Sequence, residues 1–210
     1  MRIGVLGATG TIGGCVVEEA RGRGHEVAEF GRRVFDPLDE RAMTGALDGL
    51  DVVVNAISPG REPADAVRDA AVLPAVARTL LAAMTAHPRV RAIVVGGAGS
   101  LEVRPGLQVV DVPGFAEGLP ERLGVPVDYV EAVRAHRAAL RLYRLSDRLW
   151  TYLSPSAGRV ERGGRTGRFR VGGDQLLDGP GGISAEDLAV AVVDEAEQAR
   201  HVQRRFTVGY

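Results

Sequence analysis

Residues 1–16 read MRIGVLGATGTIGGCV, and the interpretation of the whole chain starts from this stretch. Arg2–Leu6 is a short apolar run typical of a buried parallel strand, and a helical pattern runs from Thr11 to about Arg23. Between them, glycines at positions 7, 10 and 13 follow the pattern G-x-x-G-x-x-G. A strand, a glycine-rich turn and a helix in this order form the opening unit of a dinucleotide-binding domain.

The three glycines of this turn have separate roles. Gly7 allows a tight turn off the strand, Gly10 lets a pyrophosphate approach the backbone, and Gly13 lets the helix pack closely on the sheet. Free N–H groups and the positive end of the helix dipole then bind the phosphate. A glycine triplet alone is weak support among 28 glycines, and a turn that binds nothing is the alternative. The predicted cofactor-binding residues of the turn are Gly7, Ala8, Thr9, Gly10, Thr11 and Ile12.

The composition is that of an ordinary globular domain. With 210 residues, 45% hydrophobic and 25% charged, one domain with a sizeable core is expected. The net charge of −1 gives no indication of a nucleic-acid or membrane partner. All 26 basic residues are arginines, so any mechanism that depends on a lysine is excluded.

The numbers and positions of cysteine and histidine residues indicate the cellular compartment and whether a metal site is expected. Cys15 is the only cysteine, so an internal disulfide is excluded and a reducing compartment is indicated. The N-terminus lacks a basic region followed by an apolar one, and no apolar run approaches about 18 residues. We therefore predict a cytoplasmic protein. One cysteine and four scattered histidines have no metal-ligand spacing, so no metal is predicted.

Beyond the first unit, strands and helices alternate to the end of the chain. The predicted strands are 26–30, 51–56, 90–95, 149–153 and 205–209, the last at a sheet edge. The predicted helices are 36–49, 64–87, 128–145 and one that starts at 183. This alternation predicts a single α/β domain over residues 1–210, of Rossmann type, with a doubly wound parallel sheet and helices on both faces. A small Gly/Arg-rich insertion is expected near 159–178.

Two helices carry more specific expectations. The 64–87 helix contains Pro74, which predicts a kink, and its broad apolar surface leaves a homodimer open. The 128–145 helix is amphipathic. Its expected inward residues are Val130, Val133, Ala138, Leu142 and Leu145.

The ends of the second and third strands supply further predicted cofactor contacts. Arg32 and Arg33 follow the second strand, where an arginine pairs with the 2′-phosphate of NADP(H). NADP(H) is therefore favoured, with Glu29 as an NAD-type acid and two solvated arginines as the alternatives. After the third strand, the residues predicted to meet adenine and ribose are Asn55, Ala56, Ile57 and Ser58, and an incidental polar turn is the alternative.

Several segments together resemble one protein family. They are GATGTIG (7–13), VGGAGSLEV (95–103), WTYLSP (150–155), RTG (165–167) and RFTVGY (205–210). The chain resembles, over essentially its full length, the NAD(P)H-binding, NADH-flavin reductase-like group of the atypical short-chain dehydrogenases. This group is related to biliverdin reductase B and to NmrA-like proteins. The resemblance implies a single Rossmann domain, NADP(H), and hydride delivery to a flavin, a quinone or a similar flat acceptor.

The same resemblance implies residues at the nicotinamide end. Ser100, just beyond the fourth strand, fills the place of a catalytic Ser or Thr, and Gly96 and Gly97 precede it. Ser154 and Pro155 lie where family members pass the nicotinamide. His136 is a candidate general acid, with an ordinary surface histidine as its alternative.

The usual catalytic pair of the wider superfamily is missing. The positions four residues after Tyr129, Tyr143 and Tyr152 hold no lysine, so alcohol oxidation by a Tyr/Lys pair is excluded. Hydride transfer to a flavin or quinone needs little beyond positioning and exclusion of water. The predicted function is an NAD(P)H-dependent reductase of flavin or quinone type. The alternatives are a non-catalytic, NmrA-like redox sensor and a sugar-nucleotide epimerase, which fails on length and on the missing pair.

Overall fold

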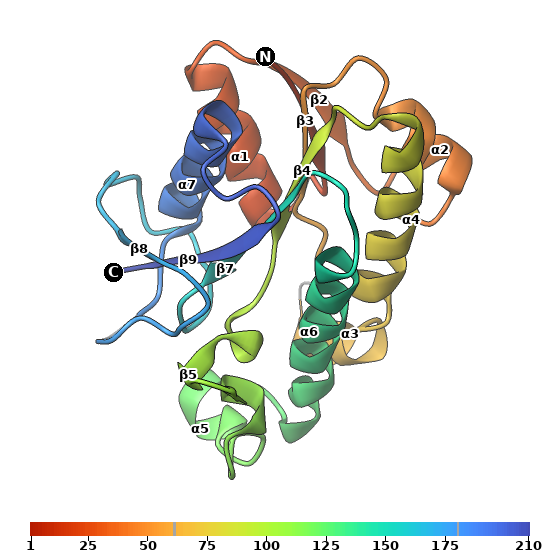
Figure 1. Cartoon of the computed structure of the whole chain (residues 1–210). Helices are drawn as coiled ribbons and strands as arrows, with labels where there is room; N and C mark the ends of the chain where they lie inside the picture. Colours follow the sequence, from red (N-terminus) through yellow and green to blue (C-terminus); the bar gives the residue numbers. More distant parts are fainter. Residues whose placement is uncertain (61, 180) are drawn as a thin grey trace.

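The apolar run after Met1 becomes the first strand of a central sheet. In the computed structural model, which describes residues 1–60, 62–179 and 181–210, Ile3, Val5 and Leu6 are fully buried. Strands of a parallel sheet are covered by helices on both faces, so continuous apolar runs of this kind are what the sheet requires. Helices lie on both faces of the sheet, and the predicted Rossmann-type α/β fold is confirmed (Figure 1).

The sheet has seven strands, of which all but one edge strand are parallel. Their order is β2 (Glu26–Phe30), β1 (Arg2–Leu6), β3 (Val52–Asn55), β4 (Arg91–Val95), β7 (Trp150–Pro155), β9 (Arg204–Gly209) and β8 (Arg170–Gly172). The order reverses at β1, where β2 lies on one side and β3 on the other. This reversal is the switch point at which doubly wound sheets bind their ligands.

Two layers of helices cover the sheet. On one face lie α1 (Thr11–Gly22) and α7 (Ala185–Gln198), which share a core with Ile3, Val5 and Ile93. On the other face lie α2 (Glu40–Ala46), α4 (Val72–Ala86) and α6 (Val130–Arg144). No helix among the described residues is both long and apolar enough to cross a membrane.

A small lobe is inserted between β4 and α6 (Figure 1). Its elements are η1 (Ala98–Ser100), β5 (Glu102–Arg104), β6 (Leu107–Gln108), η2 (Val109–Asp111), α5 (Leu119–Leu123) and η3 (Val127–Tyr129). The lobe has its own apolar cluster, with Val110, Leu119, Val125 and Val130 buried together. It therefore stands as a packed wall beside the carboxyl ends of β4 and β7.

The prediction of one kinked helix over 64–87 is wrong. The segment forms two helices, α3 (Pro63–Arg68) and α4 (Val72–Ala86). Pro74 is the third residue of α4, where a helix has no internal acceptor for the N–H that proline lacks. The helical segment is therefore interrupted before Pro74, and no kink forms at Pro74 itself. Tight turns connect the two helices, one of them closed by a hydrogen bond from the Val72 N–H to the Asp69 carbonyl oxygen (3.0 Å).

Two further expectations fail on packing. The last strand, β9, lies inside the sheet because β8 pairs with it antiparallel and forms the edge. On α6, Ala138 and Leu145 are exposed. The fully buried face of α6 consists of Val130, Ala132, Ala135, Ala139, Leu140 and Tyr143. Small alanines form the contact face because α6 packs closely on the sheet and on α4.

The insertion near 159–178 folds back over α1 and α7. Arg165 pairs with Glu19 of α1 at 2.7 Å, and the buried carboxylate of Asp187 accepts from the N–H groups of Thr166 (2.8 Å) and Gly167 (2.7 Å). Burial by itself raises the pKa of Asp187, but the hydrogen bonds from Thr166, Gly167 and Tyr210 outweigh it and hold the pKa below its usual value. The carboxylate therefore stays charged and fixes the insertion on α7.

Candidate functional site

The glycine-rich turn is shaped by two close backbone contacts. Gly7 has φ = +80°, and a Cβ there would lie 2.8 Å from the carbonyl oxygen of Ala56. A Cβ on Gly13 would lie 2.2 Å from the carbonyl oxygen of Gly7. No side chain fits at either position, so these two glycines let β1, β3 and α1 approach each other.

Gly10 differs from the other two glycines. It is the N-cap residue of α1 in an extended conformation (φ = −82°, ψ = 170°), and a Cβ there would meet only the Gly7 carbonyl oxygen, at 3.2 Å. No side chain caps α1, and its first turn holds no acidic residue. The first turn of α1 therefore has neither a capping side chain nor a carboxylate of its own to complement the positive end of the helix dipole.

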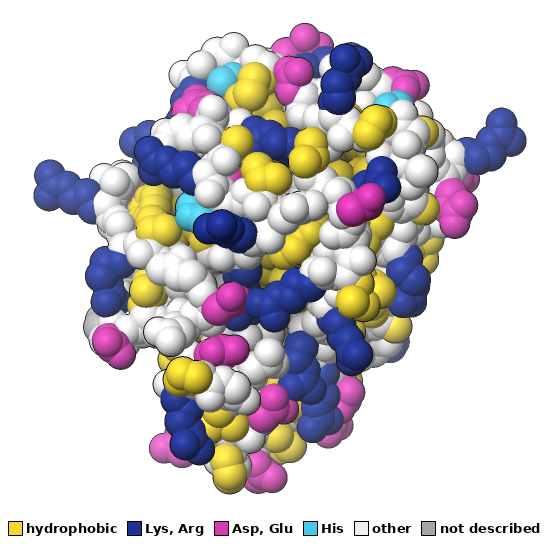
Figure 2. Space-filling model, viewed as in Figure 1, with side chains coloured by type: hydrophobic (Ala, Val, Ile, Leu, Met, Phe, Trp, Pro, Cys, Tyr) yellow, Lys and Arg dark blue, Asp and Glu magenta, His cyan; other side chains and the backbone are white. Residues whose placement is uncertain are grey.

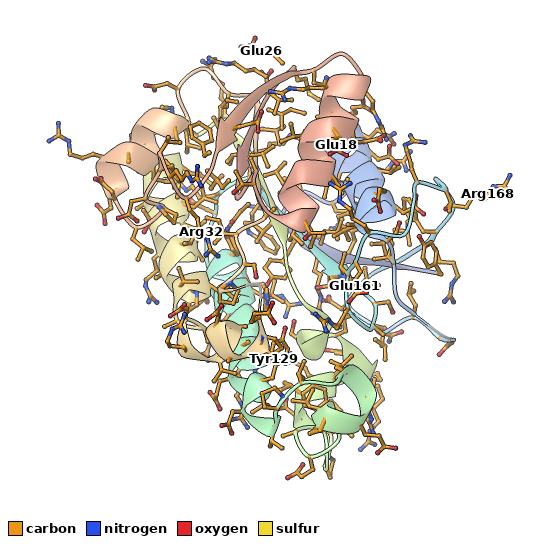
Figure 3. The ribbon with its side chains drawn as sticks, turned by 180° about the vertical axis from the view of Figure 1, so that it is seen from behind. Glu18, Glu26, Arg32, Tyr129, Glu161 and Arg168 are labelled. Carbon is orange, nitrogen blue, oxygen red and sulfur yellow. The ribbon has the colours of Figure 1, made fainter. Side chains whose placement is uncertain are left out.

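The ends of β1, β2 and β3 meet beside this turn. Arg32 donates from Nη2 to the carbonyl oxygen of Ser58 (3.2 Å), and a Cβ on Gly31 would lie 2.8 Å from Thr9 Cγ2. Seen from behind, Arg32 lies on one side of the N-terminal end of α1 and Glu161 of the insertion lies on the other (Figure 3). The predicted residues of this half of the site are thus brought together.

The charged residues at the end of β2 differ in whether they have ion-pair partners. Glu29, the candidate NAD-type acid, forms an ion pair with Arg21 at 2.7 Å. Arg32 and Arg33 are exposed, and no carboxylate of the described residues forms an ion pair with either. Their positive charges are available to an anionic ligand.

The loop after β3 divides into structural and exposed positions. Asn55 is buried, and its Oδ1 accepts from the N–H of Ile57 (3.1 Å), while the Ile57 side chain packs on the core. Ser58 is exposed, and its hydroxyl donates to the Gly60 carbonyl (2.8 Å). Asn55 and Ile57 therefore hold the loop, and Ala56 and Ser58 border the glycine turn and Arg32.

Of the two glycines after β4, Gly96 is required by packing, and Gly97 lies close to a histidine ring. A Cβ on Gly96 would lie 1.9 Å from Cε1 of Tyr152, and one on Gly97 would lie 3.3 Å from Cδ2 of His136. The Gly96 N–H donates to the Leu153 carbonyl (2.8 Å), which extends the pairing of β4 with β7. These contacts hold the loop at the carboxyl end of the sheet, beside α6.

His136 does not suit the role of a general acid. Its ring is half-buried against Gly97, and burial lowers the pKa of His136 to about 4. The imidazole is therefore neutral near pH 7 and has no imidazolium proton to give.

Ser100 lies in a buried polar network that the sequence did not reveal. The side chain is 2% exposed, and its Oγ accepts from Nη1 of Arg205 (3.0 Å). Arg205 is held in turn by Asp174 of the insertion, with Nε to Oδ1 at 2.7 Å. An arginine has only donors, so the Ser100 hydroxyl proton remains available to another acceptor.

Arg205 and Asp174 are the residues that the sequence interpretation missed. The sequence feature that could have indicated them is the alternation of polar and apolar residues along Arg205, Phe206, Thr207 and Val208 of the predicted strand. If that strand lies inside the sheet, its polar face is also buried and must find partners. The strand was expected at the edge, where such residues face water.

Ser154 has a buried hydroxyl without a partner. It is fully buried at the end of β7, as is Pro155, and among the described residues its Oγ makes no hydrogen bond. Thr207 donates to the Ser154 carbonyl oxygen (2.9 Å), not to the hydroxyl. Buried polar groups are normally paired, and the Ser154 hydroxyl departs from this rule.

Comparison with known proteins agrees with this geometry. Residues 32–199 match the model of a family described as NAD(P)H-binding. The chain belongs to this NAD(P)H-binding family. A nicotinamide cofactor is therefore supported for this chain, and the family is oxidoreductase-like.

Individual relatives extend over the whole chain. The uncharacterized protein YwnB of Bacillus subtilis is 31% identical over 99% of this chain and 98% of its own length. A solved structure of a candidate exported protein from Burkholderia pseudomallei is 38% identical with a TM-score of 0.85, and each chain is covered completely. SP1627 of Streptococcus pneumoniae, a candidate NADH-flavin reductase, is 25% identical with a TM-score of 0.82, covering 100% of this chain and 99% of its own.

Proposed function

We propose that this protein is an NADPH-dependent reductase that delivers hydride to a flat acceptor of flavin or quinone type. The observation that carries the proposal is the uncapped start of α1 at the switch point of the sheet, from which the carboxyl ends of β3, β4 and β7 follow one another along one edge. The pyrophosphate at the centre of a dinucleotide would lie at the helix start, with the adenine end towards β2 and the nicotinamide end towards β4 and β7. SP1627, similar over the full chain, is a candidate NADH-flavin reductase.

The preference for NADPH rests on Arg32 and Arg33. Both arginines are exposed beside the glycine turn, and the competing acid Glu29 is paired with Arg21. A guanidinium binds a phosphate through charge-assisted, often bidentate hydrogen bonds, whereas an acid is needed to bind the 2′-hydroxyl of NADH.

Replacement of Arg32 by alanine is expected to weaken NADPH binding about tenfold and NADH binding less than twofold. Only NADPH carries the 2′-phosphate, and a charged hydrogen bond contributes about 1.5–3 kcal/mol. The measurement is titration of both dinucleotides by intrinsic fluorescence or calorimetry. Arg168→Ala, at an exposed position of the insertion, is the control. Equal losses for the two dinucleotides would remove the NADPH assignment.

The main role of the residues near the acceptor is to hold the reactants in place and to shield them from water, and they take little direct part in the reaction. A bound nicotinamide would supply the hydride, and a reduced flavin or quinone takes its further proton from water. The Ser154 hydroxyl would orient the ring through its amide, and the Ser100 hydroxyl, which accepts from Arg205, would donate a hydrogen bond to the acceptor. The lobe wall from η1 to α5 would limit the access of bulk water to the nicotinamide.

One observation favours a second candidate, a non-catalytic sensor of NADP(H). Ser100 is almost fully buried and His136 is neutral, so neither predicted proton donor stands open at the surface of the site. A protein that binds the dinucleotide and reports it to a partner needs neither group.

NADPH oxidation, followed at 340 nm with FMN, riboflavin and a simple quinone in turn, tests the proposal. Saturable turnover is expected, and Ser100→Ala is expected to lower kcat about tenfold with KM for NADPH nearly unchanged. Ser146→Ala, in the turn before β7, is the matched control. Tight NADPH binding without turnover on any acceptor would overturn the reductase and support the sensor.

A further inference from the structure

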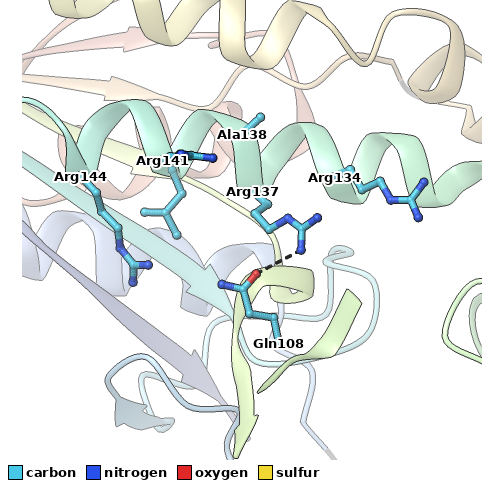
Figure 4. A pocket seen from close by; sticks show the side chains of 7 residues that line it. Gln108, Arg134, Arg137, Ala138, Arg141 and Arg144 are labelled. Atoms are coloured by element: carbon cyan, nitrogen blue, oxygen red, sulfur yellow. Dashed lines mark hydrogen bonds between the residues drawn. The ribbon is translucent and has the colours of Figure 1, made fainter. Parts of the chain in front are cut away.

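A groove lined by arginines runs along the side of α6 that faces away from the sheet. It has a volume of about 490 Å³ and is lined by Arg134, Arg137, Arg141 and Arg144 of α6 and by Gln108 of β6 (Figure 4). Dark blue arginine side chains gather on this face of the molecule over α6 (Figure 2). We call this feature the arginine groove. Arg134, Arg137 and Arg141 have no role in the nicotinamide site, whereas Arg144 shares Asp174 with Arg205 of that site.

Three of the four arginines already bind carboxylates of the chain. Arg134 pairs with Glu131 (2.7 Å), Arg144 pairs with Asp174, and Arg137 holds both carboxylate oxygens of Asp111 (2.7 and 2.9 Å). These pairs show that the guanidinium groups of the groove are placed for carboxylate ligands.

Arg141 is the exception in the middle of the row. Among the described residues no carboxylate lies within ion-pair distance of its guanidinium, and it lines the groove between Arg137 and Arg144 (Figure 4). The groove therefore carries surplus positive charge at its centre, in a chain whose net charge is −1.

The row of arginines fits an extended ligand. The four residues are spaced by three, four and three positions, which at 1.5 Å per residue places them along about 15 Å of one helix side. A second hollow of about 360 Å³ shares Arg144 and is lined by both Arg204 and the carboxylate of Asp174, so the surplus charge is confined to the first hollow. An extended peptide of about five residues spans the first hollow alone.

We propose that the arginine groove binds an acidic, extended segment of a partner protein, with one of its carboxylates on Arg141. Carboxylates are the groups that the neighbouring arginines already hold, and their charge complements the surplus. A nucleic acid fits less well, because the described residues that line the first hollow include no aromatic side chain on which a base could stack. This surface is independent of the proposed reductase activity.

Fluorescence anisotropy with a labelled hexaglutamate peptide tests the proposal. The full-length protein is expected to bind this peptide saturably at low ionic strength and more weakly as NaCl is raised. Arg141→Gln is expected to raise Kd about tenfold, and Arg168→Gln, the same change at an exposed position of the insertion (Figure 3), less than twofold. Both variants should bind NADPH like the wild type, which keeps this test separate from that of the nicotinamide site.

Three outcomes would overturn the proposal. They are an absence of hexaglutamate binding, equal losses in Arg141→Gln and Arg168→Gln, and tighter binding of hexaglutamine or of an oligothymidylate than of hexaglutamate. Thermal melting of Arg141→Gln serves as the folding control, and because this side chain is exposed to the groove, its melting temperature should match the wild type.

Discussion

Gly10→Val is expected to abolish binding of both NADPH and NADH while the protein stays folded. A Cβ at Gly10 meets only the Gly7 carbonyl oxygen, at 3.2 Å, and the backbone is in an extended conformation that valine adopts readily. The branched side chain would occupy the space through which a pyrophosphate reaches the first turn of α1. We expect Kd to rise at least a hundredfold, about 2.7 kcal/mol, for both dinucleotides.

Calorimetric titration of the two dinucleotides, with a thermal melt of the free protein, measures this effect. Gly22→Val, the same change at the other end of α1 where a Cβ meets nothing within 4 Å, should bind like the wild type. Unchanged affinity of Gly10→Val would place the pyrophosphate elsewhere and would remove the central element of the proposed site.

The neighbouring glycines Gly13 and Gly14 are expected to respond in opposite directions to alanine. In Gly13→Ala the new Cβ would lie 2.2 Å from the carbonyl oxygen of Gly7, and only a backbone shift between β1 and α1 relieves this clash. We expect a loss of about 3 kcal/mol in the free energy of unfolding, or a melting temperature lower by about 10 °C.

Gly14→Ala is the matched partner of this experiment. Its Cβ would lie 3.6 Å from the Ala8 carbonyl oxygen, an ordinary contact, and alanine is the better helix former inside α1. Stability should rise by up to about 1 kcal/mol. Urea unfolding of both variants and the wild type decides the matter. Equal stability of the two variants would show that the close approach of α1 to β1 does not depend on Gly13.

Local sequence patterns were sufficient to predict those elements whose structure depends mainly on their own residues. The apolar runs gave strands at the predicted places, since a parallel strand covered on both faces needs continuous apolar sequence. The glycine turn could also be predicted, because Gly7 and Gly13 are required by contacts within one strand-turn-helix unit and its neighbouring strand. Pro74 was misjudged because its effect depends on where a helix begins.

In the candidate site, too, some residues could be placed from local sequence and others depended on distant contacts. Arg32 and Ser58 lie at the ends of strands, and parallel order alone predicts that such ends meet, as their hydrogen bond confirms. Ser100 was placed correctly along the chain, but its partners Arg205 and Asp174 are more than 70 residues away in sequence. Their meeting depends on β9 lying inside the sheet, which follows from the pairing of β8.

The sequence by itself determined the Rossmann-type order of strands and helices and the glycine-rich turn. Both arise from short-range requirements, namely apolar periodicity and the absence of a side chain at close backbone contacts. Only the tertiary structure decided the state of the remaining groups. Burial neutralises His136, the internal position of β9 brings Arg205 to Ser100, and the packing of α6 turns its arginines outward into one groove. The charge and the hydrogen bonds of a side chain depend on which distant elements of the chain cover it. The residues next to it in sequence do not predict those elements.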